Sequence, residues 1–310
     1  MTAALARSTL LEVEHVTRYH YAAPVELAHH LAYLRPPHNA QQQVESFDLN
    51  VVPPPMHHAS GADRLGNLRS CFTVDRPHRV LEVRSRSRLR VQAPATVDAA
   101  ASAPWETVRE RLRYAAGRAW EPANEFVHAS PYIPSLDALR QWAAPSVAAG
   151  RPVAELGLEL MARVHAEFSY RNASTEVDTP LAEVLARREG VCQDFAHLLI
   201  GALRSIGLAA RYVSGYLLTT PPDDGATAPR AAPWLGADAS HAWAALWCPA
   251  ADGGAAAWLE LDPTNDVLPS TAHVRVAVGR DYGDVTPLRG VIRGGGEHRL
   301  EVQVRTERIA

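Results

Sequence analysis

The segment GVCQDFAHLLIGALRSIG, at residues 190–207, decides the fold of the second half of the chain. Its spacing predicts a helix, because its apolar residues recur every three or four positions and form one continuous face. Gly207 supplies the expected C-terminal stop. Cys192 then lies in the first turn, where backbone N–H groups have no partner within the helix. The apolar face consists of Phe195, Leu198, Leu199, Ala202, Leu203 and Ile206.

Cys192 is the candidate nucleophile. The positive end of a helix favours a thiolate over a thiol, and a free N–H group in the first turn can donate to an oxyanion. The alternative is a buried structural cysteine, because unpaired cysteines are among the most buried residues. The position of Cys192 alone does not separate these two interpretations.

A histidine and an aspartate are predicted to meet across a β-hairpin. Strand-like runs at 242–247 and 257–262 flank the turn signal Asp252-Gly253-Gly254. A register that pairs residues 247 and 256 also pairs His241 with Asp262. A general base and its orienting carboxylate must be held in this way. With Cys192, the two residues predict a nucleophile, a base and an orienting acid.

Two other interpretations concern the same region. Cys192, His197, His241 and Cys248 have the residue types of a zinc site, but their spacings match no zinc signature. We therefore predict no metal site and no cofactor. A non-catalytic scaffold that binds a partner through its β-domain is the alternative from another class.

The chain divides into four regions in an α+β arrangement. Alternating apolar residues predict an N-terminal antiparallel β-sandwich over 1–95. An Ala- and Pro-rich stretch opens a helical linker region over 96–150. The catalytic core is predicted over 151–275, with the cysteine-bearing helix packed on an antiparallel sheet. A C-terminal segment over 276–310 contains a strand that we expect to pack back on the β-domain.

Composition limits the possible partners and the compartment. Of 310 residues, 31 are Lys or Arg and 34 are Asp or Glu, so the net charge of −3 gives no general reason to expect binding to nucleic acid or to an anionic membrane. No stretch has the roughly 18 apolar residues that a membrane span needs. Three scattered cysteines form no disulfide framework, so we expect a cytoplasmic protein. The sequence leaves the oligomeric state open.

The residues around this constellation resemble the transglutaminase-like superfamily, in its prokaryotic branch. The resemblance lies in GVCQDFAHLL (190–199), RYVSGYL (211–217), DASHAWAALW (238–247) and WLELDPTND (258–266). It extends to VTRYHYAAPVELAHHLAYLRPP (16–37), to DRLGN (63–67) and to GRDYGDVTPLRGV (279–291). It implies a papain-like core in which Cys192 is the nucleophile, His241 the base and Asp262 the orienting residue.

The resemblance also bears on the reaction. The animal cross-linking enzymes have a tryptophan after the nucleophile, whereas Gln193 and Asp194 follow Cys192 here, and no acidic calcium loop is present. We therefore expect a cysteine-dependent amide hydrolase that acts on a peptide or protein through a thioester, with acyl transfer to an amine as the alternative. Gln193, Asp194, Tyr216 and Trp243 are the candidate substrate contacts.

Overall fold

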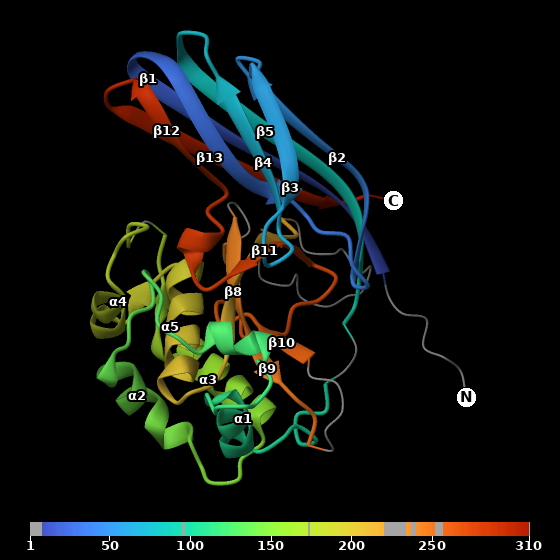
Figure 1. Cartoon of the computed structure of the whole chain (residues 1–310), viewed down its shortest axis with the longest axis vertical. Coiled ribbons are helices and arrows are strands. Elements are labelled where there is room, and N and C mark those ends of the chain that lie inside the picture. The colour runs from blue at the N-terminus through green and yellow to red at the C-terminus, as the bar shows by residue number, and fades with distance from the viewer. Residues whose placement is uncertain are drawn as a thin grey trace, which may run out of the picture.

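A computed structural model describes residues 8–94, 97–172, 174–219, 234–236, 240–251 and 257–309. Within those ranges, no helix has the length and the apolar character needed to cross a bilayer. The secondary structure is mixed, with two main antiparallel sheets and a group of helices around the second sheet, as predicted for an α+β fold (Figure 1).

The N-terminal sheet is built around one long strand, β1 (Ser8–Arg35). The first half of β1 pairs with β5 and β13, and the second half pairs with β4 and β12. Ala22–Pro24 lies between the two halves, and pairing on both sides of it keeps the strands in one sheet. Its other strands are β2 (Gln42–Val52), β3 (His57–Ala62), β4 (Leu68–Val74), β5 (His78–Gln92), β12 (Leu288–Gly294) and β13 (His298–Arg308).

The core of this sheet joins strands that pair with different halves of β1. Leu81 and Val83 of β5 share an apolar cluster with Phe72 and Val74 of β4. The folded sheet therefore encloses its own core, as a sandwich does. The C-terminal strands β12 and β13 pair with β1, so the C-terminal segment lies in the N-terminal sheet.

The second sheet has the order β10-β9-β8-β11 and carries the predicted site. Its strands are β8 (Ala210–Leu217), β9 (His241–Cys248), β10 (Ala257–Leu261) and β11 (His273–Gly279). The predicted boundary at residue 275 falls inside β11, because the strand continues the sheet to Gly279. The turn expected at 252–254 lies outside the described residues.

Helices pack against one face of this sheet, where α5 (Cys192–Ser205) contacts β9 and β8. The predicted apolar face is buried from Phe195 to Leu203, whereas Ile206 is half-buried, and Gly207 follows with a φ of 86°. The other helices are α1 (Trp105–Leu112), α2 (Asp137–Ala143), α3 (Val153–Glu167) and α4 (Leu181–Arg187), with 3-10 turns at Pro122–Phe126, Ala144–Ser146 and Tyr282–Asp284. A short parallel pair, β6 (Ser169–Tyr170) and β7 (Glu189–Gly190), precedes α5.

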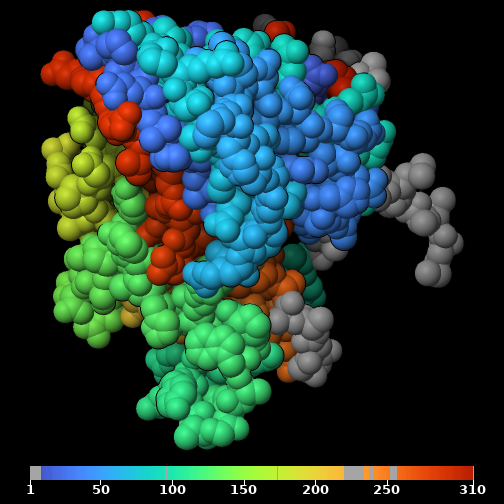
Figure 2. Space-filling view, turned by 45° about the horizontal axis from the view of Figure 1, so that its top comes forward, coloured from blue at the N-terminus to red at the C-terminus, as the bar shows by residue number. Residues whose placement is uncertain are grey.

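The N-terminal sheet contacts the free edge of β11 through two side-chain amides. Gln42 donates to the carbonyl of Arg275 and accepts from its N–H, both at 2.8 Å. Asn67 makes the same pair of bonds with Val278, also at 2.8 Å. These amides satisfy backbone groups on an edge strand that would otherwise be unpaired. Figure 2 shows the red C-terminal residues lying between the blue and cyan strands and the green segment.

Candidate active site

Cys192 is the first residue of α5, and a buried cap fixes this end of the helix. Asp194 accepts a hydrogen bond from the N–H of Val191 at 2.9 Å and another from the Thr175 hydroxyl at 2.6 Å. A Cβ on Gly190 would lie 2.8 Å from the Asp194 carboxylate, so only glycine fits beside the cap. Burial raises the pKa of Asp194, although these two bonds oppose the shift.

His241 and Asp262 form a buried hydrogen-bonded pair. Nε2 of His241 lies 2.9 Å from Oδ2 of Asp262, and the two side chains are essentially inaccessible to solvent. The predicted register was wrong by two residues, because Trp258 and not residue 256 pairs with Trp247. A shift of two preserves the face on which each side chain lies, so His241 and Asp262 become diagonal instead of direct neighbours and still meet.

The Asp262 carboxylate is held by donors on both oxygens. The N–H groups of Thr264 and Asn265 donate to Oδ1 at 2.9 and 3.3 Å. The Asn265 amide and the His273 ring reach Oδ2 at 2.9 and 3.2 Å. Burial favours the neutral acid, but the charge of His241 and the bonds from both histidines keep the pKa of Asp262 well below its usual range.

The remaining ring nitrogen of His241 is Nδ1, on the side of the ring away from Asp262. Burial alone would lower the pKa of His241, but its attraction to Asp262 and its interactions with Asp262 and Cys192 raise it to about 10. Nδ1 has no hydrogen-bond partner among the described residues, so it is the nitrogen left for an interaction with the thiol. Cys192 is 8% exposed, and its Sγ lies 3.9 Å from the carbonyl oxygen of Ser240. The structure therefore brings the three predicted residues together.

The backbone of Gly236 lies against the same ring nitrogen. A Cβ at this position would be 2.9 Å from Nδ1 of His241 and 3.4 Å from the Tyr170 hydroxyl, and φ is +79°. Leu235, which precedes Gly236, donates its N–H to the side-chain oxygen of Asn265 at 3.0 Å, and Asn265 itself donates to Asp262. Sequence reasoning missed Gly236 and Asn265, because neither lies in a periodic element.

Comparisons with known proteins find two family models that match this chain. The bacterial transglutaminase-like N-terminal region matches residues 11–90, and the transglutaminase-like superfamily matches residues 140–263. An uncharacterized protein of Mycobacterium tuberculosis is 40% identical over 93% of this chain and 89% of its own length. The chain belongs to the transglutaminase-like superfamily.

Other relatives extend the likeness over the whole chain. An uncharacterized protein of Mycobacterium leprae is 30% identical over 97% of this chain and 99% of its own length. The crystal structure of a candidate cysteine protease from Cytophaga hutchinsonii superposes with a TM-score of 0.72, covering 98% of this chain and 92% of that one. At 18% identity this structure shows the shared transglutaminase-like fold.

Three of the candidate substrate contacts of this transglutaminase-like chain lie around the site but differ in how buried they are. Gln193 is half-buried and donates to the carbonyl of Val177 at 3.0 Å, whereas Asp194 is buried in the helix cap. Trp243 is fully buried next to the His241 ring and donates to Glu260 at 3.0 Å, so it supports the site from behind.

The expectation that Tyr216 lies on the substrate side does not fit the structure. Its hydroxyl lies 3.0 Å from Nδ1 of His15 on β1, and its side chain is buried. Burial also raises the pKa of Tyr216. The residue belongs to the contact between the two sheets. The alternation along β8 could indicate a face, but it could not reveal that β1 covers that face.

The site residues also contain a group with metal-ligating atoms. His241, Asp262 and His273 are buried and offer ligand atoms within 4.8 Å of one another. Their facing atoms already form the hydrogen bonds described above, so hydrogen bonding accounts for the cluster. The zinc combination is not assembled: His241 and Cys248 are at opposite ends of β9, about 23 Å apart at 3.3 Å per residue, and His197 accepts from the N–H of Tyr282.

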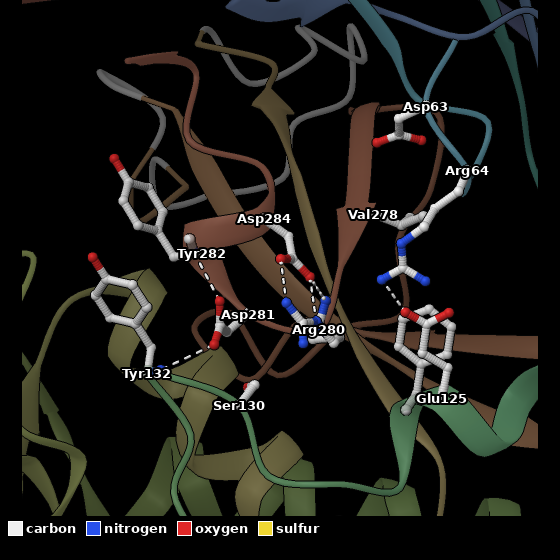
Figure 3. A network of polar contacts seen from close by, with 12 residues as sticks. Asp63, Arg64, Glu125, Ser130, Tyr132, Val278, Arg280, Asp281, Tyr282 and Asp284 are labelled. Atoms are coloured by element: carbon white, nitrogen blue, oxygen red, sulfur yellow. Dashed lines mark hydrogen bonds and ion pairs between the residues drawn. The ribbon is translucent and has the colours of Figure 1, made fainter. Parts of the chain in front are cut away.

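The turn at 279–284 contacts α5 through a hydrogen bond from the N–H of Tyr282 to His197. Figure 3 shows the other polar contacts around this turn. Asp281 is buried and accepts from the N–H groups of Tyr132 and Gly283, both at 2.9 Å. Arg280 pairs with Asp284 at 2.9 Å, and Arg64 pairs with Glu125 nearby. Burial lowers the pKa of His197 to about 3, which suits its role as a neutral acceptor from this turn.

Proposed function

We propose that this protein is a cysteine-dependent amide hydrolase acting on peptide or isopeptide bonds. Cys192 is the nucleophile, His241 the general base and acid, and Asp262 the orienting acid. The observation that carries the proposal is the buried 2.9 Å pair of His241 and Asp262, which leaves one ring nitrogen of His241 for a thiol at the start of a helix. The likeness to a candidate cysteine protease fold supports it.

The proposed reaction begins with His241 and Cys192 as an ion pair. The thiolate attacks the amide carbonyl, and the first-turn N–H groups of α5 face the developing oxyanion. The C–N bond breaks as His241 gives its proton to the leaving amine, which leaves a thioester on Cys192. His241, now neutral, takes a proton from water as the water attacks. The acid then leaves, and the thiolate is restored.

Acyl transfer shares every step up to the thioester. An amine in place of water would give a new amide instead of an acid, and the residues that form the thioester are common to both outcomes. A peptide library with quenched fluorophores, incubated with and without a primary amine, separates them. We expect free acid as the main product; an amine adduct that outcompetes the acid would contradict hydrolysis.

Cysteine labelling tests the machinery without a known substrate. Cys71 is exposed and Cys248 is buried, with the pKa of Cys248 raised to about 12 by burial. Accessibility alone would therefore make Cys71 react fastest with iodoacetamide. We expect Cys192 to react at least tenfold faster than Cys71, and we expect His241→Ala to abolish that advantage. Three slow thiols would support a scaffold without catalytic activity.

Two further variants test the assigned roles in turnover of any library substrate. Cys192→Ala should abolish turnover while the fold survives, because the change is small and lies at a helix start. Asp262→Asn should cost less, because it disturbs the tautomer and orientation of His241 without removing the nucleophile. Substantial activity in Cys192→Ala would refute the assignment.

A further inference from the structure

We propose that His273 is a positioning residue that holds the Asp262 carboxylate and, through it, orients His241. This inference rests on the proposed function. His273 lies beyond the matched superfamily region, which ends at residue 263, and no periodic pattern in the sequence connects it to the site. Its ring comes within 3.2 Å of the oxygen that also accepts from His241.

The hydrogen bonds of His273 fix its tautomer. The N–H of Ser270 donates to Nδ1 of His273 at 3.3 Å, so Nδ1 is the acceptor nitrogen. In the neutral ring, Nε2 then carries the hydrogen and donates to Oδ2 of Asp262. A donor of this kind stabilises the carboxylate form of Asp262 without adding a second positive charge beside His241.

The position of His273 in the sheet distinguishes it from the other donors to Asp262. Thr264 and Asn265 belong to the turn that directly follows Asp262, so they move with it. His273 begins β11, whereas Asp262 follows β10, and these strands are the two opposite edges of the sheet. The bond from His273 therefore fixes the carboxylate relative to the rest of the sheet, including the strand that carries His241.

Aromatic packing holds the His273 ring in one orientation. The rings of Trp243 and Trp234 approach it nearly perpendicularly, with centroids at 5.5 and 5.8 Å. Trp243 also lies 6.0 Å from the His241 ring. His273 is 4% exposed, so water does not compete for its bond to Asp262. An apolar ring would fill the same volume but would leave Asp262 without this donor.

Labelling of Cys192 by iodoacetamide, followed by mass spectrometry, tests the inference in the 310-residue chain. His273→Phe keeps an aromatic ring but removes the donor, and we expect it to slow labelling about tenfold, as the loss of a hydrogen bond to a charged group would. His273→Gln places an amide N–H near the position of Nε2, and we expect it to restore the rate to within threefold of wild type.

A matched control separates positioning from general stability. His30→Phe replaces another buried histidine, which lies in the N-terminal sheet and stacks on Phe72 with ring centroids at 5.2 Å. We expect it to leave the labelling rate of Cys192 within twofold of wild type, whatever its effect on the melting temperature. Equal slowing by His273→Phe and His273→Gln would overturn the inference, because the donor would then not matter.

The outcomes for the two proposals are distinguishable. If His241→Ala slows labelling and His273→Phe does not, the positioning role fails and the proposed function stands. If wild-type Cys192 reacts no faster than Cys71 and His241→Ala changes nothing, the proposed function fails and the inference fails with it. Slow labelling in His273→Phe with recovery in His273→Gln supports both.

Discussion

Substitution of Asn67 tests how the N-terminal sheet is fixed to the second sheet. The side chain of Asn67 is buried and makes two bonds of 2.8 Å to the backbone of Val278 and a third to Asp63. Asn67→Ala removes all three and leaves the N–H and carbonyl of Val278 without partners. The partner groups lie on β11, an edge strand that no other strand in the described residues covers on this side.

The expected cost follows from these contacts. A hydrogen bond contributes about 1 kcal/mol net, and a buried group left unpaired costs about 1–3 kcal/mol. Asn67→Ala should therefore lower the free energy of unfolding by about 2–5 kcal/mol, a large part of the roughly 5–15 kcal/mol typical of a protein. Asn67→Asp should cost more at pH 7, because an oxygen would replace the NH₂ group that faces the Val278 carbonyl and the Asp63 carboxylate.

Thermal unfolding measures the difference. At about 2–4 °C per kcal/mol for a large domain, we expect Asn67→Ala to lower the melting temperature by roughly 4–20 °C. Asn50→Ala is the matched control, because Asn50 is exposed on β2, and its change should be about 1 °C or less. A melting temperature for Asn67→Ala as close to wild type as that of Asn50→Ala would refute the reasoning.

Two more predictions concern the site and the pH dependence of stability. Gly236→Ala should slow labelling of Cys192 at least tenfold, because its methyl group would press on Nδ1 of His241 and its φ of +79° disfavours a side chain. Gly117→Ala is the control, because Gly117 also has a φ of +79° but lies in open space. Equal labelling rates in the two variants would contradict the packing argument. Burial lowers the pKa of His15 from 6.5 to about 4, so folding favours its neutral form. This preference contributes about 3 kcal/mol to the free energy of unfolding. The contribution is complete above pH 6.5 and is lost as the pH falls through 4. Melting curves from pH 7 to pH 4 should therefore fall less steeply for His15→Gln than for wild type, and parallel curves would show that His15 is not the acid-sensitive group.

The sequence was most informative where the chemistry depends on local structure. The apolar face of 190–207 predicts α5 and places Cys192 at its start, and alternation along two strands predicts that His241 and Asp262 share a face. The register error did no harm because it was even: a shift of one residue would have separated the pair. The position of the site within the fold thus follows from periodicity, and the family resemblance agrees with it.

The sequence was least informative where contacts join distant segments. His273 reaches Asp262 only because the chain between β10 and β11 crosses the end of the sheet, and no spacing rule encodes that crossing. Tyr216 was misplaced for a similar reason, since burial by β1 is a property of the tertiary structure. Ala22–Pro24 resembles a break, yet β1 continues because strands on both sides of it pair with the same sheet.

The strand β11 connects these long-range contacts. Its first residue, His273, donates to Asp262, and backbone groups on its free edge form hydrogen bonds with the side-chain amides of Gln42 and Asn67. Its end leads into the turn whose Tyr282 N–H donates to His197 on α5. A displacement of the N-terminal sheet would therefore act on the strand that begins at His273 and on the helix that begins at Cys192. Among the described residues, no side chain of the N-terminal sheet forms a hydrogen bond with Cys192, His241 or Asp262. The sheet nevertheless contributes to the geometry of the site, because it holds the strand on which both ends of the proposed machinery depend.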